Sequence, residues 1–169
     1  MEGLPILPVD HPMLRRKSSR VRRVTPGVRQ MIGKMFATMD AHHAVGVAAN
    51  QIGRPWRLIV VGVHDDRLAL INPEIVRTNG FHVADEGCLS LPNWYGPVER
   101  AEKITVQAID TKGGNFRRDA QGLLARAIQH EIDRRQQLDA TAASREETDV
   151  DDLLKQKHDV QQRIAALEE

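Results

Sequence analysis

The sequence contains little of several features that would place it in a specialised class of protein. Its 169 residues include a single cysteine, so no disulfide can form within the chain. No apolar run approaches the roughly 20 residues of a membrane-spanning helix. The formal net charge of +1 gives no overall attraction to nucleic acid or to an anionic membrane. We therefore expect a soluble cytoplasmic protein of one domain, with no membrane contact.

Charge is nevertheless concentrated in two segments. Six Arg and Lys residues fall within the nine positions from Arg15 to Arg23. Such a run is usually a solvated loop, and the alternative is a surface that faces phosphate groups. No aromatic residue lies among these charges, so base stacking is not predicted. Residues 145–169 hold eight acidic and four basic residues around a thin apolar stripe, which predicts a charged C-terminal helix or tail after a domain of residues 1–144.

Two stretches have the periodicity of amphipathic helices. The first runs from Pro26 to His42, where Thr25 can cap the helix and proline occupies the first helical position. The second runs from about residue 120 to 138. Its predicted apolar stripe consists of Leu123, Leu124, Ala127, Ile128 and Ile132.

Other stretches are typical of strands. Residues 57–63 are apolar enough to be buried on both faces of a sheet. Residues 103–110 alternate between apolar and polar side chains, and residues 112–115 form a hairpin turn after them. Shorter strands are predicted at 68–71 and 81–85, and we expect Asn72-Pro73 to end the first of these.

Three further stretches contain residues suited to catalysis. Ala44–Gly53 is rich in small residues and includes Gln51, whose amide could donate to a developing oxyanion. Glu86–Pro92 contains the only cysteine. His130–Arg134 reads HEIDR, one residue away from the H-E-x-x-H pattern that places two imidazoles and a general-base glutamate on one helix.

These residue types together suggest one kind of chemistry. A thiolate and an imidazole suit a borderline-soft divalent metal, and a neighbouring glutamate can deprotonate a metal-bound water. A side-chain amide and a backbone N–H can hold the oxyanion that forms when water attacks a carbonyl. The set therefore indicates a metal-assisted amide hydrolase.

The chain resembles the peptide deformylases. Their motifs GxGLAAxQIG, EGCLSLP and HExDH correspond, in the same order, to Ala44–Gly53, Glu86–Pro92 and His130–Arg134. The resemblance covers roughly residues 4–135. It implies an α+β fold in which mixed antiparallel sheets pack around a central helix with the HEIDR motif.

The resemblance also implies an activity and a role for individual residues. Family members remove the formyl group from the N-terminal methionine of nascent polypeptides, using iron(II), with zinc, nickel or cobalt able to replace it. Contact with the ribosome is compatible with this activity, and no specific nucleic acid is implied. The implied metal ligands are Cys88 and His130, the acid/base is Glu131, the formyl oxygen is held by Gln51 and the Leu89 backbone N–H, and Gly46 and Arg100 bind or adjoin the substrate backbone.

The main departure from the family pattern is Arg134, which replaces the third metal ligand. A guanidinium stays protonated and has no lone pair to donate. The replacement-ligand candidates are His42, His43, His82 and Asp133.

This departure leaves three functional hypotheses. The first is a metallohydrolase with reduced or altered activity. The second is a metal-free amidase in which Cys88 and His130 act as a thiolate–imidazole pair. The third is a catalytically impaired protein that binds N-terminal peptides in the cleft or acts through its C-terminal helix.

Overall fold

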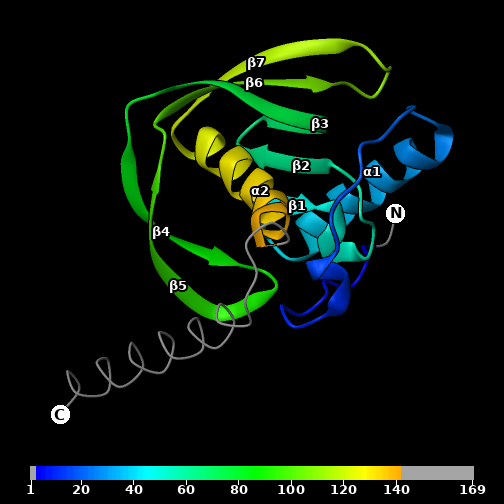
Figure 1. The fold of residues 1–169 in the computed structure, drawn as a ribbon, viewed down its shortest axis with the longest axis horizontal. Coiled ribbons are helices and arrows are strands. Elements are labelled where there is room, and N and C mark those ends of the chain that lie inside the picture. Colours follow the sequence, from blue (N-terminus) through cyan, green and yellow to red (C-terminus); the bar gives the residue numbers. More distant parts are fainter. Residues whose placement is uncertain (1–2, 142–169) are drawn as a thin grey trace. The chain divides into compact units, whose positions relative to one another are not determined.

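The computed structural model describes residues 3–141 (Figure 1). Nearly all of them belong to one compact unit, Met1–Asp139. The predicted C-terminal helix and the boundary at residue 144 lie outside the described residues. The described elements are η1 (Pro12–Arg15), α1 (Pro26–Ala41), β1 (Gly46–Ala48), η2 (Ala49–Ile52), β2 (Leu58–Val63), β3 (Asp66–Asn79), β4 (His82–Cys88), β5 (Leu91–Arg100), β6 (Lys103–Ile109), β7 (Asn115–Gln121) and α2 (Gly122–Thr141).

The strands form a five-stranded antiparallel sheet in the order β1-β2-β3-β6-β7 and a separate β4-β5 ribbon. Strand β2 is buried on both faces, as its sequence predicted. Ile59 and Val61 pack with α2, whereas Leu58 and Val60 pack with α1. Figure 1 shows α2 near the centre, between the sheet and the β4-β5 ribbon. The predicted α+β fold with a central HEIDR helix is confirmed.

Helix α1 begins where its capping signals predicted. The Thr25 hydroxyl accepts a hydrogen bond from the Val28 N–H at 3.3 Å, and Pro26 occupies the first helical position, where no intrahelical donor is needed. Its buried side chains are Val28, Met31, Ile32, Met35, Thr38 and Met39. The periodicity read from the sequence is therefore the face that packs on the sheet.

Helix α2 begins at Gly122, two residues later than predicted, because residues 120 and 121 still pair in β7. Gly122 has φ +58°, a conformation that glycine adopts without steric cost and that turns the chain from strand into helix. Leu123 was wrongly placed in the buried stripe: it is 44% exposed. The next residue, Leu124, is only 8% exposed in the sheet core, so Leu123, about 100° away around the helix axis, lies off the face that the core buries.

The prediction that Asn72-Pro73 ends a strand was wrong, because β3 continues through both residues to Asn79. The pairing with β6 shifts register between Ile71 and Glu74, so Pro73 lies in a bulge, where its missing N–H costs no ladder bond. Asn72 takes a positive φ of 51°, and its buried amide forms two hydrogen bonds with the main chain of Val21. A residue pair that usually breaks a strand here joins it to the N-terminal segment.

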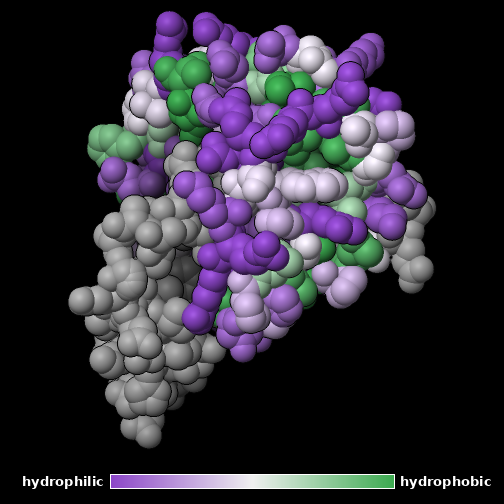
Figure 2. Space-filling model, turned by 45° about the vertical axis from the view of Figure 1, so that its right-hand side comes forward, coloured by the Kyte–Doolittle hydropathy of each residue, from purple (hydrophilic) through white to green (hydrophobic). Residues whose placement is uncertain are grey.

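None of the described helices is long and apolar enough to cross a membrane. Figure 2 shows hydrophilic side chains over much of the face in view, with apolar side chains scattered among them. Such a mixture is normal for a folded domain in water.

Candidate active site

The first and third motifs meet where β1 passes α2. Gly46 is buried at the start of β1, and a Cβ built on it would lie 2.9 Å from Glu131 Cγ and 3.0 Å from Glu131 Oε1. Glu131 itself is only 5% exposed. The close packing of β1 on this carboxylate therefore requires glycine at position 46. This steric requirement explains why the first motif has a glycine there.

We expect Gly46→Ala to reduce catalytic turnover by roughly 10²-fold, because the added methyl group displaces the carboxylate of Glu131, the predicted acid/base, and small misplacements of a catalytic group have effects of that size. The effect is measured as formate released from a formyl-methionyl peptide, the substrate that the resemblance implies. Gly27→Ala is the matched control, since its Cβ would have 3.7 Å to the nearest atom. Equal activity of the two variants would contradict the contact that we describe.

The first and second motifs meet at Gln51. Its Oε1 accepts a hydrogen bond from the Ala48 N–H at 2.8 Å, and its Nε2 lies 3.4 Å from Ser90 Oγ. The side chain is 2% exposed, so these contacts fix its orientation. Because Ala48 uses the amide oxygen, the amide N–H₂ points toward the turn that contains Leu89 and Ser90. Gln51 thus lies beside Ser90, the residue after Leu89, and the joint role of Gln51 and the Leu89 N–H in holding the formyl oxygen stays a prediction.

The N-terminal segment holds this turn in place. The Leu7 N–H donates to the Gln51 carbonyl at 2.8 Å, and the Val9 N–H donates to the Ser90 carbonyl at 2.9 Å. One extended segment therefore bridges the first two motifs. The Gln51 amide and the backbone of the turn are therefore held in place before a substrate binds. Hydrogen-bond donors that are fixed in this way require no rearrangement when negative charge develops on a substrate.

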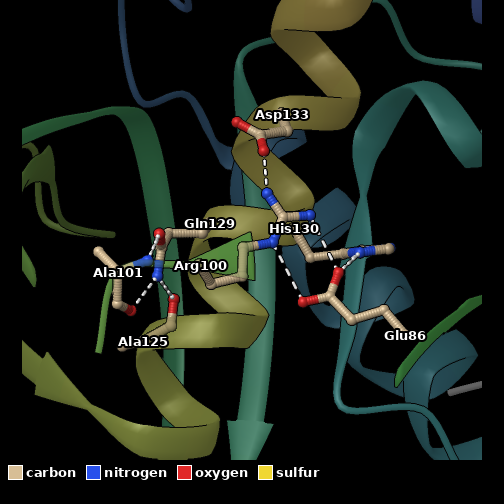
Figure 3. Close-up of polar contacts among 7 residues, drawn as sticks. All are labelled: Glu86, Arg100, Ala101, Ala125, Gln129, His130 and Asp133. Carbon is tan, nitrogen blue, oxygen red and sulfur yellow. Dashed lines mark hydrogen bonds and ion pairs between the residues drawn. The ribbon is translucent and has the colours of Figure 1, made fainter. Parts of the chain in front are cut away.

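The second and third motifs meet at Glu86. Its Oε2 lies 2.8 Å from His130 Nδ1, and its carboxylate also accepts two hydrogen bonds from Arg100, at 3.1 Å from Nε and 2.9 Å from Nη2 (Figure 3). Arg100 Nη1 reaches Asp133, one turn further along the face of α2. Since Glu86 occupies Nδ1 of His130, the imidazole presents Nε2 as its remaining lone-pair position.

The charges in this network determine the ionisation of Glu86. Burial alone would raise the pKa of Glu86, but hydrogen bonds from Arg100 and His130 outweigh burial and hold that pKa below its ordinary value. The pKa of Arg100 is raised: burial opposes its charge, and the pairs with Glu86 and Asp133 outweigh that effect. Glu86 therefore stays ionised at neutral pH.

We expect Glu86→Gln to lower the free energy of unfolding by about 3 kcal/mol at neutral pH, because it removes one partner of a buried ion pair. The depressed pKa of Glu86 stabilises the fold above the ordinary carboxyl pKa of 4.5, and this contribution is lost as pH falls through the folded-state pKa. Urea unfolding of both proteins at neutral and acidic pH measures the difference. Glu99→Gln, at an exposed position, is the control. A difference that persists unchanged in acid would contradict this assignment.

Gln129 fixes the position of the helix that contains the motif. Its Nε2 donates to the carbonyls of Ala101 and Ala125 at 2.8 and 3.0 Å, and its Oε1 accepts from the Ala101 N–H at 2.9 Å (Figure 3). The side chain is 7% exposed. This clamp ties α2 to the connection between β5 and β6 one residue before His130.

Sequence reasoning assigned no role to Glu86, Gln129 or Ser90, although all three lie within or beside the quoted motifs. Arg100 was predicted to bind or adjoin the substrate backbone, and the structure places its guanidinium between Glu86 and Asp133 with 11% of its side chain exposed. Its contact with a substrate stays a prediction. The sequence signal for these contacts was the presence of acidic and basic residues in and beside different motifs. The sequence alone does not show which of these residues pair.

The α+β fold brings the three motifs into pairwise contact: Gly46 packs on Glu131, Gln51 lies beside Ser90, and Glu86 contacts His130. The family pattern described as Polypeptide deformylase matches residues 4–139. The chain belongs to the peptide deformylase family.

Individual relatives agree with this assignment. The chain is 45% identical over 137 residues to the peptide deformylase of Thermomicrobium roseum, covering 76% of this chain and 78% of the relative. It is 42% identical over 133 residues to that of Syntrophomonas wolfei, covering 79% and 88%. The structure matches a crystal structure of the Synechococcus elongatus peptide deformylase in complex with actinonin with a TM-score of 0.76 at 40% identity, covering 80% of this chain and 75% of that one.

The family implies a divalent metal ion, and the described residues do not complete a site for one. Cys88 ends β4, two residues after the glutamate that contacts His130, so a thiol and an imidazole are both available. Catalytic metal sites of this type use three protein ligands. Among the described side chains, no group of three or more His, Cys, Asp and Glu residues could hold a metal ion. Position 134 supplies an arginine, which cannot coordinate.

Proposed function

We propose that this protein removes the formyl group from the N-terminal methionine of nascent polypeptides. The observation that supports this best is the pairwise contact of all three motifs: Gly46 with Glu131, Gln51 with Ser90, and Glu86 with His130. Each contact joins residues more than 35 positions apart in sequence. These contacts support a site in which Glu131 would act as general base beside the oriented Gln51 amide and His130.

The residues of this site have distinct tasks in the proposed reaction. Gln51 Nε2 and the Leu89 N–H hold the formyl oxygen and stabilise its developing negative charge. Glu131 takes a proton from the attacking water, whose oxygen forms a bond to the formyl carbon. Glu131 then passes the proton to the nitrogen as the C–N bond breaks. The products are formate and a free N-terminal amine.

Arg134, in place of the third ligand, lowers the affinity of this site for a metal ion. Cys88 and His130 alone are two donors, and Asp133, one of the predicted replacements, pairs with Arg100. We therefore propose that the protein binds iron(II), or a zinc, nickel or cobalt ion in its place, with lower affinity than a site that has all three ligands of the family motif. The same proposal includes a cytoplasmic location for this function. It also includes contact with the ribosome while the substrate is nascent.

The test is formate release from formyl-Met-Ala-Ser by the full-length chain. We expect formate in the presence of added iron(II) or nickel(II), and none from the acetylated peptide of the same sequence. The Glu131→Gln variant supplies the inactive reference. Tight binding of the formyl peptide without formate release would contradict the hydrolase and favour the peptide-binding protein.

A metal-free thiol hydrolase is the second candidate, favoured by the 2.8 Å contact between Glu86 and His130 Nδ1. An imidazole that is oriented by a carboxylate can act as base toward a cysteine thiol. In that reaction the Cys88 sulfur would form a bond to the formyl carbon as the C–N bond breaks, and the protonated His130 imidazole would give its proton to the leaving amine. Water would then hydrolyse the S-formyl cysteine to formate and the free thiol. Cys88→Ser would then abolish turnover that persists in the presence of a metal chelator, whereas chelator-sensitive turnover would exclude this candidate.

A further inference from the structure

The stretch from Leu14, near the end of η1, to the start of α1 presents one sign of charge outward. Its buried side chains are Leu14, Ser18 and Val21, which are 7%, 2% and 8% exposed. The remaining long side chains all point to solvent. These exposed cations are Arg15, Arg16, Lys17, Arg20, Arg22 and Arg23. We call residues 15–23 the basic segment.

The main chain of the basic segment is hydrogen-bonded at two places, to the residues just before β2 and to Asn72 in β3. The Ser19 N–H donates to the Pro55 carbonyl at 2.7 Å, and the Arg57 N–H donates to the Ser19 carbonyl at 2.8 Å. Val21 exchanges two hydrogen bonds with the buried amide of Asn72, at 2.8 and 2.9 Å. A segment that is already ordered loses less conformational entropy when it binds a partner.

Little of this charge is neutralised. Of the six cations, only Arg20 forms an ion pair with a described residue, 2.9 Å from Glu74, with both side chains about half exposed. Exposed pairs of this kind are weak and exchange readily. Arg54 is exposed and adds a further cation. It precedes Pro55 and Trp56, beside which the basic segment lies. The whole chain has a formal net charge of +1 and the basic segment has +6, so the other residues together have −5. The near-neutral total therefore gives no sign of this basic surface.

We infer that the basic segment binds the phosphodiester backbone of a nucleic acid without regard to base sequence. Five of its six cations are arginines, whose planar guanidinium binds phosphate oxygens in pairs. Residues 15–23 contain no aromatic side chain for stacking on bases, and their one large apolar side chain, Val21, is buried. The surface therefore fits phosphates on a flexible polyanion better than a membrane, which would require exposed apolar anchors. This inference does not depend on the proposed hydrolase activity.

The test is fluorescence anisotropy of labelled oligo(U) with the full-length protein between 50 and 200 mM salt. Six phosphate contacts on a single strand predict a slope of about −4 for log affinity against log salt, hence a loss of affinity on the order of 10²-fold across this range. Replacing Arg20, Arg22 and Arg23 by Gln should reduce the slope to about −2. Duplex DNA should show the same dependence on these three residues.

A second triple variant is the matched control, with the same change in charge at exposed positions of the sheet: Arg77, Lys103 and Arg117 replaced by Gln. We expect it to retain the parent slope. Equal losses in the two triple variants would overturn the inference, because binding would then follow net charge alone. Absence of binding at 50 mM salt, or binding to phosphatidylserine vesicles in preference to both nucleic acids, would also overturn it. Unchanged circular dichroism of both variants shows that the fold is intact.

Discussion

Glu131→Gln is expected to reduce the turnover of formyl peptides by roughly 10²- to 10⁴-fold, the range that general acid–base catalysis contributes. Glutamine keeps the shape of the side chain and its packing against Gly46, but it cannot accept the proton that the proposed mechanism assigns to Glu131. Because the glutamate is 5% exposed, no bulk water replaces it as base. Single-turnover formate release at saturating peptide isolates this step from binding.

The same variant separates the proposed functions when its peptide affinity is measured in parallel. A hydrolase loses turnover and keeps its affinity, since Glu131 is assigned a proton and not a binding contact. Glu102→Gln, the same substitution at the turn before β6, is the control and should match the parent. Parent-level turnover in Glu131→Gln would remove the water-activating role of this residue and leave the Cys88 mechanism.

Arg134→His is expected to increase formyl-peptide hydrolysis on the order of 10²-fold. Loss of even an outer contact to a metal ligand costs 10- to 100-fold in affinity or activity in well-studied sites, so restoring a direct ligand should have at least a comparable effect. Position 134 lies four residues after His130 on α2, where the two side chains of an H-E-x-x-H helix share one face. The substitution also removes a positive charge from that face.

Arg135→His is the control for this gain, because it removes the same charge and adds the same imidazole one residue further along the helix, about 100° around its axis. Initial rates of formate release with saturating nickel(II) compare the three proteins. A gain shared by both variants would show that charge removal, not ligation, is responsible. No gain in either would mean that the remaining site is not preorganised for hydrolysis.

The fold could be predicted from the sequence wherever local signals agreed with packing. The cap at Thr25, the apolar periodicity of α1 and the continuous apolar run of β2 were all visible in the sequence. The length of β3 was not, because Asn72-Pro73 is a strand breaker in isolation. Its amide is instead satisfied by Val21, a residue 51 positions away, and no local pattern predicts such a partner.

The site was predicted as a set of residues and not as an arrangement. Motif spacing identified Gln51, Cys88 and Glu131, and the resemblance to a family assigned their roles. The contacts that orient the site were not visible in the motifs. Ala48 fixes the Gln51 amide from within the same motif, whereas the His130 ring is fixed by Glu86, which lies 44 residues away in another motif. Such contacts depend on how α2 meets the β4-β5 ribbon, which three-dimensional packing alone determines.

The metal content of Arg134→His tests most directly whether the site is complete except for its third ligand. The parent, Arg134→His and Arg135→His, each dialysed against the same limiting nickel(II) or cobalt(II), are compared by elemental analysis as metal per chain. We predict near one metal per chain in Arg134→His and well below that in the parent and in Arg135→His. Equal metal content in Arg134→His and the parent would contradict the account, because either the arginine does not prevent binding or Cys88 and His130 are not arranged to share a metal.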